Sequence, residues 1–240
     1  MSYEAGEWII RGIPADSPDR LKSPEELIEY VSTVGFLPLF RSEVPGLSVE
    51  EHTLAEDWWS DAPERDPWMW RAVAAGSGKV AYGKFFGGRA GFISTDWFPY
   101  FANHRRDGYD FDARWEDGKA NVRAKKIMDV FAQGEEHFSF ETKQLAGFGK
   151  GGEKGFESCV TALQMQSYLV VKDFRCRLNK RGEPYGWSIA VYAAPESIWG
   201  YDAVTSAYSE SPEDSAERIR AHLLRVCPEA NEAQIRKLLR

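Results

Sequence analysis

The sequence predicts an α+β protein built from tandem winged helix-turn-helix units with short antiparallel hairpins, followed by C-terminal helices. Three observations lead to this prediction. Apolar residues recur at helical spacing, aromatic β-like runs come in pairs around glycine turns, and residues 139–193 follow the order helix, turn, helix, hairpin. The 240 residues, 43% hydrophobic and 28% charged, suffice for a core and exclude a disordered or fibrous chain.

The N-terminal helix has the clearest local signals. After a short β-like run at residues 8–10, Ser23 is a good N-cap, and Glu26 three residues later completes a capping box. Gly35 then ends the apolar stripe. A second helix is expected near Ser48, where Glu51 repeats the same spacing.

The next elements complete a first predicted domain at residues 1–134. Two strands, 79–86 and 90–94, flank a glycine pair and predict a hairpin. A short aromatic helix follows, then a charged surface loop or hairpin at 105–118 and an amphipathic helix at 120–133.

A second predicted domain covers residues 135–200, and a helical tail covers 201–240. In the second domain, helices at 139–145 and 155–169 flank a glycine-rich turn, and strands at 168–177 and 187–193 form a hairpin with a basic tip. In the second strand, alternation places Trp187, Ile189 and Val191 inward. Other small α+β domains also contain helix–hairpin units, so the winged-helix interpretation is not the sole one.

The glycine-rich turn at 147–152 matches the pattern G-x-G-x-x-G, but a helix and not a strand precedes it. A dinucleotide fingerprint requires that strand, so we interpret the segment as the turn of the helix-turn-helix. Lys150 and Lys154 would then face a nucleic-acid phosphate beside a helix N-terminus.

The charge distribution separates two kinds of segment. The net charge is −7, yet residues 1–70 hold fifteen acids and five bases, whereas 142–181 holds eight bases and three acids. The basic segment favours a local polyanion-binding face, or it only neutralises the acidic one. The residues expected to contact nucleic acid are Lys150, Lys154, Thr161, Gln164, Arg175, Arg177, Lys180 and Arg181.

Four tryptophans lie between residues 58 and 70. They predict either a packed aromatic core or an exposed stacking surface. The three cysteines and four histidines are scattered without metal-ligand spacing, so we expect no metal and no cofactor. The chain shows no secretory signal and no membrane span, which makes a cytoplasmic location the default expectation.

Several segments resemble the AlkZ-type (YcaQ-like) DNA glycosylases. The resemblance rests on FETKQLAGFGKGGEKGF, SCVTALQMQSYLV and DFRCRLNKRGEPYGWSIAVY, and on the earlier EELIEYVSTVGF, DPWMWR and KVAYGKFFGGRAGFIS. It implies tandem winged helices, double-stranded DNA as partner and a link to repair of alkylated DNA. The family uses a glutamine-x-glutamine motif, but the matching segment 35–40 contains no glutamine, and the triplet Gln164-Met165-Gln166 falls in the second domain.

Three hypotheses therefore remain. The leading one is a DNA-binding protein of tandem winged-helix form. The second is an active glycosylase that removes alkylated or crosslinked bases, an activity the sequence leaves uncertain. Its weak catalytic candidates are Gln164, Gln166, Asp66 and Asp107. The third is a non-enzymatic protein-interaction module that uses the acidic segment and the tryptophans. The sequence does not determine the oligomeric state.

Overall fold

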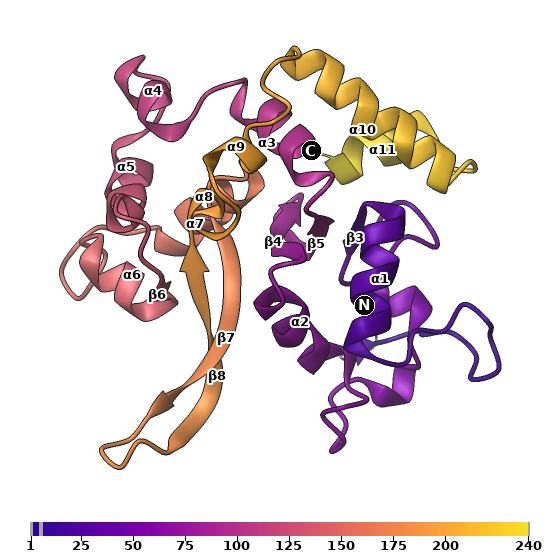
Figure 1. The fold of residues 1–240 in the computed structure, drawn as a ribbon. Helices are drawn as coiled ribbons and strands as arrows, with labels where there is room; N and C mark the ends of the chain where they lie inside the picture. The colour runs from indigo at the N-terminus through magenta and orange to yellow at the C-terminus, as the bar shows by residue number, and fades with distance from the viewer. Residues whose placement is uncertain (1, 5–6, 240) are drawn as a thin grey trace. The chain divides into compact units, whose positions relative to one another are not determined.

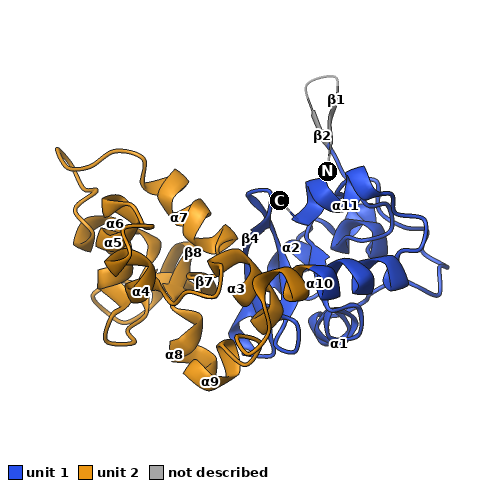
Figure 2. Ribbon diagram, turned by 90° about the horizontal axis from the view of Figure 1, so that it is seen from above, with its two compact units in different colours: residues 1–97, 217–240 blue, residues 98–216 orange. Residues whose placement is uncertain are grey.

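The computed structural model of the protein describes residues 2–4 and 7–239 (Figure 1). The chain forms two compact units: unit 1 contains residues 1–97 and 217–240, and unit 2 contains residues 98–216 (Figure 2). Helices and antiparallel strands occur together, as the predicted α+β class requires. Both expected domain boundaries, after residues 134 and 200, fall inside unit 2, and the three-domain division stays a prediction, as does the winged-helix assignment.

Unit 1 is built around a three-stranded antiparallel arrangement in the order β3-β5-β4. Helices α1 and α2 pack against each other, and both contact β4. Its elements are β1 (Ser2–Glu4), β2 (Glu7–Ile9), α1 (Pro24–Val34), β3 (Phe36–Pro38), η1 (Val49–His52), η2 (Ala55–Asp57), α2 (Pro67–Gly76), β4 (Val80–Phe86), β5 (Arg89–Ser94) and α11 (Glu232–Leu239). Helix α10 (Pro212–Val226) begins in unit 2 and ends in unit 1.

The start of α1 is as the sequence predicts. Ser23 accepts a hydrogen bond from the Glu26 amide at 3.3 Å, and Gly35 ends the helix with a φ of 86°. The helix expected near Ser48 is only the 3-10 turn η1. The Ser48 side chain nevertheless caps this turn by accepting a hydrogen bond from the Glu51 amide. A capping signal therefore located both starts, but it did not show that the second element is only one short turn.

A glycine lets β3 and β5 approach closely. A Cβ on Gly91 would lie 2.7 Å from the Leu37 carbonyl oxygen and 2.5 Å from the Phe86 ring. Neither the backbone nor a buried ring can move easily, so only glycine fits where β3 pairs with β5.

Unit 2 has its own antiparallel strands, in the order β7-β8-β6. The segment 105–118, expected as a loop, contains a helix that begins where Asp110 accepts the Ala113 amide at 2.9 Å. The elements of unit 2 are α3 (Phe98–Arg106), α4 (Phe111–Glu116), α5 (Val122–Met128), η3 (Asp129–Phe131), β6 (His137–Phe138), α6 (Ser139–Leu145), α7 (Phe156–Met165), β7 (Val170–Leu178), β8 (Pro184–Ala193), α8 (Pro195–Trp199) and α9 (Tyr201–Val204).

A buried arginine ties the helices of unit 2 together. Arg106 is 0% exposed and lies over the ring of Tyr168 at 4.6 Å. Its guanidinium donates to the Ser167 carbonyl at 2.6 Å and forms a 2.5 Å ion pair with Glu196. The charge is thus buried with its partners, the condition under which a buried arginine is tolerated. Within the described ranges, no helix has the length and apolar character to cross a membrane.

Candidate nucleic-acid interface

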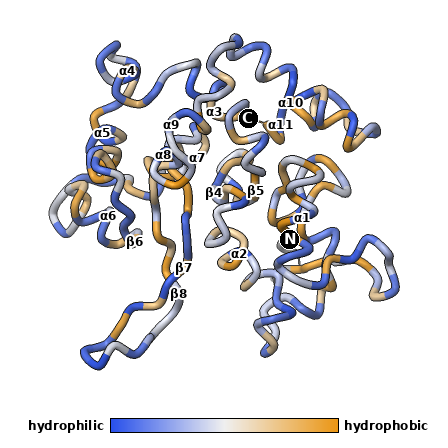
Figure 3. Tube along the Cα trace, in the orientation of Figure 1, coloured by the Kyte–Doolittle hydropathy of each residue, from blue (hydrophilic) through white to orange (hydrophobic). Residues whose placement is uncertain are grey.

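The outer half of the β7–β8 hairpin is exposed to solvent. Its two strands extend beyond the helices as a long ribbon (Figure 1). Exposure increases along it, from buried residues at the start of β7 to exposed ones at the tip. The tip is hydrophilic, whereas the base of the ribbon is apolar (Figure 3). The base is therefore part of the core, and the outer half is available to a partner.

A bulge in β8 turns one aromatic side chain into solvent. Arg175 pairs with Ile189 and Arg177 pairs with Tyr185, so the single residue Cys176 faces three residues of β8. Trp187 is the middle one of the three and is 93% exposed. The predicted inward position of Trp187 is wrong, because the bulge interrupts the alternation on which that prediction rested.

The tip itself is held by one asparagine. The Asn179 side-chain oxygen accepts the amides of Arg181 and Glu183 at 2.8 and 3.0 Å. This turn leaves Lys180 and Arg181 exposed, and neither has an ion pair with any residue that the structure describes. Arg177, also exposed, stacks over the Phe140 ring at 4.3 Å. The outer ribbon thus combines three cations with a solvent-facing indole.

The inner cations of the ribbon are paired. Arg175 donates to Glu136 and, at 2.6 Å, to Asp173, and Lys172 also pairs with Glu136. Hydrogen bonds from Lys172 and Arg175 hold the pKa of Glu136 below its ordinary value. Arg175, expected to contact phosphate, therefore has its charge locally balanced, unlike Lys180 and Arg181.

The glycine-rich turn between α6 and α7 presents two further cations. Glu153 in this turn forms ion pairs with two residues of α5, Lys126 at 2.7 Å and Arg123 at 3.3 Å. Lys150 and Lys154, on either side of it, are exposed and have no ion pair within the described ranges. This turn lies well away from the tip of the hairpin in Figure 1. Two basic sites on unit 2 are thus separate segments and not one cluster.

Helix α7 fits poorly as a reading helix. Gln164 is 1% exposed, so its predicted place on the exposed face is wrong, and Thr161 is only partly exposed. The exposed face carries Glu157, and Lys154 precedes the helix. The helix therefore offers a carboxylate and no base to a phosphate backbone.

The four catalytic candidates have different local roles. Asp66 is 3% exposed and caps α2, accepting the Trp68 amide at 2.9 Å. Asp107 is an exposed turn residue with a φ of 57°, Gln166 caps the end of α7, and Gln164 is buried. Because Gln164 is enclosed and Asp107 faces solvent, these two side chains do not share one open site.

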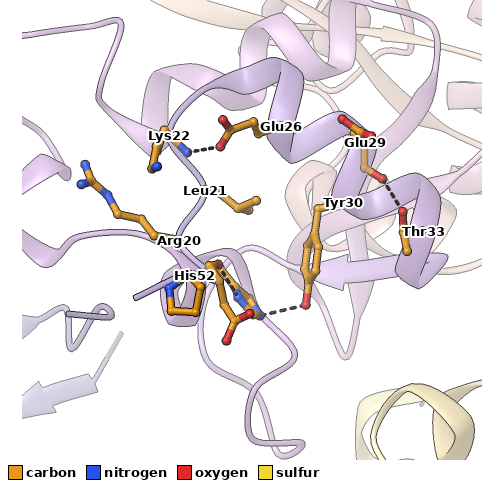
Figure 4. Close-up of a pocket in the computed structure, with 10 residues that line it drawn as sticks. Arg20, Leu21, Lys22, Glu26, Glu29, Tyr30, Thr33 and His52 are labelled. Carbon is orange, nitrogen blue, oxygen red and sulfur yellow. Dashed lines mark hydrogen bonds between the residues drawn. The ribbon is translucent and has the colours of Figure 1, made fainter. Parts of the chain in front are cut away.

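Unit 1 contains a pocket of about 490 Å³ beside α1 (Figure 4). His52 approaches the Tyr30 hydroxyl at 2.9 Å, and burial raises the pKa of Tyr30 to about 12. Arg20 and Lys22 line the pocket together with acidic side chains. This mixed lining has no excess of positive charge for a polyanion. In the described part of the chain, no cluster of three or more His, Cys, Asp or Glu side chains could hold a metal ion.

The tryptophans of residues 58–70 divide between core and surface. Trp58 and Trp70 are 5% and 2% exposed, whereas Trp59 is 49% exposed and Trp68 is partly exposed. The two predicted alternatives, aromatic core and exposed surface, therefore each describe part of the cluster.

Comparison with known proteins gives one match. A family model described as AlkZ related covers residues 21–240. The chain belongs to the AlkZ-related family. No curated protein and no solved structure matches it.

The segment 35–40, where the sequence resemblance places the glutamine motif of AlkZ-type proteins, is buried at residues 35–39. Residues 36–38 form β3, and Phe36 and Leu37 are 1% and 0% exposed. The segment 35–40 contains no side chain able to activate water. The hairpin is thus the better-defined candidate site. Sequence reasoning found its cations but missed Trp187, although Gly186 beside it, with a φ of 74°, signals a bulge.

Proposed function

We propose that the protein binds double-stranded DNA through the outer half of the β7–β8 hairpin. The observation that carries the proposal is the combination of Arg177, Lys180 and Arg181 with the 93% exposed Trp187 on one protruding ribbon. A two-stranded ribbon fits the major groove of B-DNA. Exposed cations on it would contact phosphates, and an indole in water can gain contact with a base or a sugar.

In this arrangement the β7–β8 hairpin, and not helix α7, makes the main contact with DNA. In the winged-helix interpretation, which we retain, α6 and α7 form the helix-turn-helix and β7–β8 the wing. Lys150 and Lys154 would act as a second, weaker phosphate contact, because their turn is separate from the ribbon tip. Membership of the AlkZ-related family supports a link to repair of alkylated DNA.

The test is the salt dependence of binding to a fluorescently labelled duplex, measured by anisotropy. For wild type, affinity should fall steeply as salt rises. For Lys180→Ala/Arg181→Ala, the slope of log affinity against log salt should decrease by about 2, because two phosphate contacts are lost. Lys79→Ala/Arg236→Ala removes the same charge from exposed positions of unit 1 and should leave the slope unchanged. Salt-insensitive binding, absence of binding, or equal changes in both variants would refute the proposal.

Excision of an alkylated base is a second candidate function, favoured by the family match alone. Incubation with alkylated duplex followed by cleavage at abasic sites measures it directly. Gln166→Ala and Asp107→Asn test the two candidates that are not fully buried, with Gln164→Ala and Asp66→Asn as comparisons. If wild type releases no base, this candidate function is excluded while the DNA-binding proposal stands.

A further inference from the structure

Four apolar side chains on and near α2 of unit 1 are exposed or partly exposed. Trp59, Met69 and Val73 are 49%, 40% and 51% exposed, and Trp68 is partly exposed. Trp59 and Trp68 have ring centroids 6.2 Å apart, while Met69 and Val73 are one turn apart on α2. We call these four residues the Trp59 surface.

The backbone holds Trp59 in a conformation that bulky residues seldom adopt. Its φ is 55°, in the left-handed region. Asp66, buried at 3%, accepts the Trp59 amide at 3.0 Å and the Trp68 amide at 2.9 Å. One carboxylate thus fixes both backbone positions, and the Arg71 guanidinium lies 3.6 Å from the Trp68 ring centroid. Strain of this kind persists only where the surroundings enforce it, and it is common at active sites, ligand clamps and switch regions.

The segment that carries Trp59 is acidic. Glu56, Asp61 and Glu64 are exposed and take no part in ion pairs within the described ranges. Asp57, in contrast, is neutralised by Arg65 and by Arg20 at 3.3 Å. An apolar surface beside unpaired carboxylates repels a phosphate backbone and suits a cationic partner that also carries apolar groups.

The outer hairpin has that complementary composition. Lys180 and Arg181 supply unpaired positive charge. Its exposed apolar side chains are Leu178 at 64%, Tyr185 at 49% and Trp187 at 93%.

We propose that the Trp59 surface of one copy of this chain binds the β7–β8 hairpin of a second copy. The contact joins two different surfaces, so it is a head-to-tail contact and can extend to further copies. Aromatic side chains at its centre and opposite charges around them match the composition of specific interfaces. Because duplex DNA would use the same hairpin, self-association and DNA binding would exclude each other.

A charge exchange tests the proposal without DNA. Variant A, Lys180→Glu/Arg181→Glu, makes the hairpin acidic, and variant B, Asp61→Lys/Glu64→Lys, makes the surface near Trp59 basic. In sedimentation velocity experiments across the micromolar range, wild type should self-associate, and each variant alone should be monomeric. An equimolar mixture of A and B should associate, because the unchanged hairpin of B can bind the unchanged Trp59 surface of A. The acidic hairpin of A also attracts the basic surface of B, so the complexes alternate A and B. This recovery also shows that both variants are folded.

Trp59→Gly tests the aromatic contact separately. Glycine accepts the left-handed φ of 55°, so the substitution removes the ring without adding backbone strain. Self-association should weaken roughly 10-fold or more, as for a central tryptophan of an interface. The proposal is overturned if wild type is monomeric throughout, if variant A alone still associates, or if the mixture stays monomeric. None of these outcomes depends on whether the protein binds DNA.

Discussion

The β4–β5 and β7–β8 hairpins have similar aromatic sequences but differ in burial. In unit 1, β4 and β5 are joined by Gly87 and Gly88, and six of the seven residues of β4 are buried. In unit 2, the first four residues of β8 are exposed and only its last three are buried. The charges explain the difference. Asp173, Arg175 and Arg177 alternate along β7, so one face of that ribbon cannot be covered by apolar helices.

The largest expected effect is on the buried hairpin. Phe92 is 0% exposed and packs against Tyr82 at 4.9 Å. Phe92→Ala should lower the free energy of unfolding by about 3–5 kcal/mol, because it leaves a cavity in the core. Tyr185→Ala on the exposed hairpin is the matched control and should cost less than about 1 kcal/mol. Urea denaturation of both variants measures the difference; similar losses would mean that the two hairpins are not distinct in burial.

Replacing an arginine of unit 2 should likewise cost more stability at a buried position than at an exposed one. Arg106→Met breaks the contacts with Glu196 and Ser167 and should cost about 3 kcal/mol, since a partly buried carboxylate loses its partner. Arg181→Met, at the hairpin tip, should change stability by less than about 0.5 kcal/mol. Thermal unfolding followed by circular dichroism distinguishes them. An Arg106→Met protein as stable as wild type would contradict the structural role of the buried charge.

A smaller effect should appear as pH dependence in unit 1. His222 contacts the Val34 carbonyl oxygen at 2.9 Å and stacks on Trp97 at 4.0 Å. Burial lowers the pKa of His222, the Val34 hydrogen bond opposes the shift, and Arg225 adds to it. The unfolded state therefore takes up a proton first, and stability should decrease as pH falls from about 6.5 toward the lower pKa of the folded state.

His222→Gln keeps a side-chain donor near Val34 but cannot titrate. Urea denaturation at several pH values should show a weaker dependence for this variant than for wild type between about pH 5 and 7. Identical pH profiles for the two proteins would exclude His222 as the source of the dependence.

The smallest effect should be at the bulge. Trp187→Ser should change the free energy of unfolding by less than about 0.5 kcal/mol, because the indole makes almost no contacts in the free protein. The matched substitution Trp70→Ser, at a 2% exposed position, should be strongly destabilising. If Trp187→Ser destabilises the protein as much, the indole is buried in solution and both proposals for the hairpin lose their basis.

Much of the fold could be predicted from local signals. Ser23 and Gly35 bounded α1, and Gly87-Gly88 located the first hairpin. These signals act within a few residues, so a single sequence contains them. The α4 helix was missed because its charged and aromatic residues and its Asp-Gly pairs resemble those of a loop.

The candidate site was less predictable, because it depends on burial and register. Gln164 was expected on an exposed face and is enclosed, since a helical pattern cannot show which neighbouring elements cover it. Trp187 was expected inside, because strict alternation was assumed from Val191 through Ile189 to Trp187, and the bulge begins after Ile189. In contrast, the exposed cations Lys180 and Arg181 were identified correctly as tip residues, because a polar turn with a glycine is itself a local signal.

The bulge around Trp187 has a consequence for how the ribbon can vary. Cys176 lies opposite three residues of β8, so β8 carries two residues more than regular pairing would need. Inserting or deleting residues in twos leaves every other side chain on its original face of a ribbon. During evolution the hairpin could therefore lengthen or shorten by two residues without exchanging its solvent-facing and buried faces. The length of the hairpin and the residues on each face can thus vary independently.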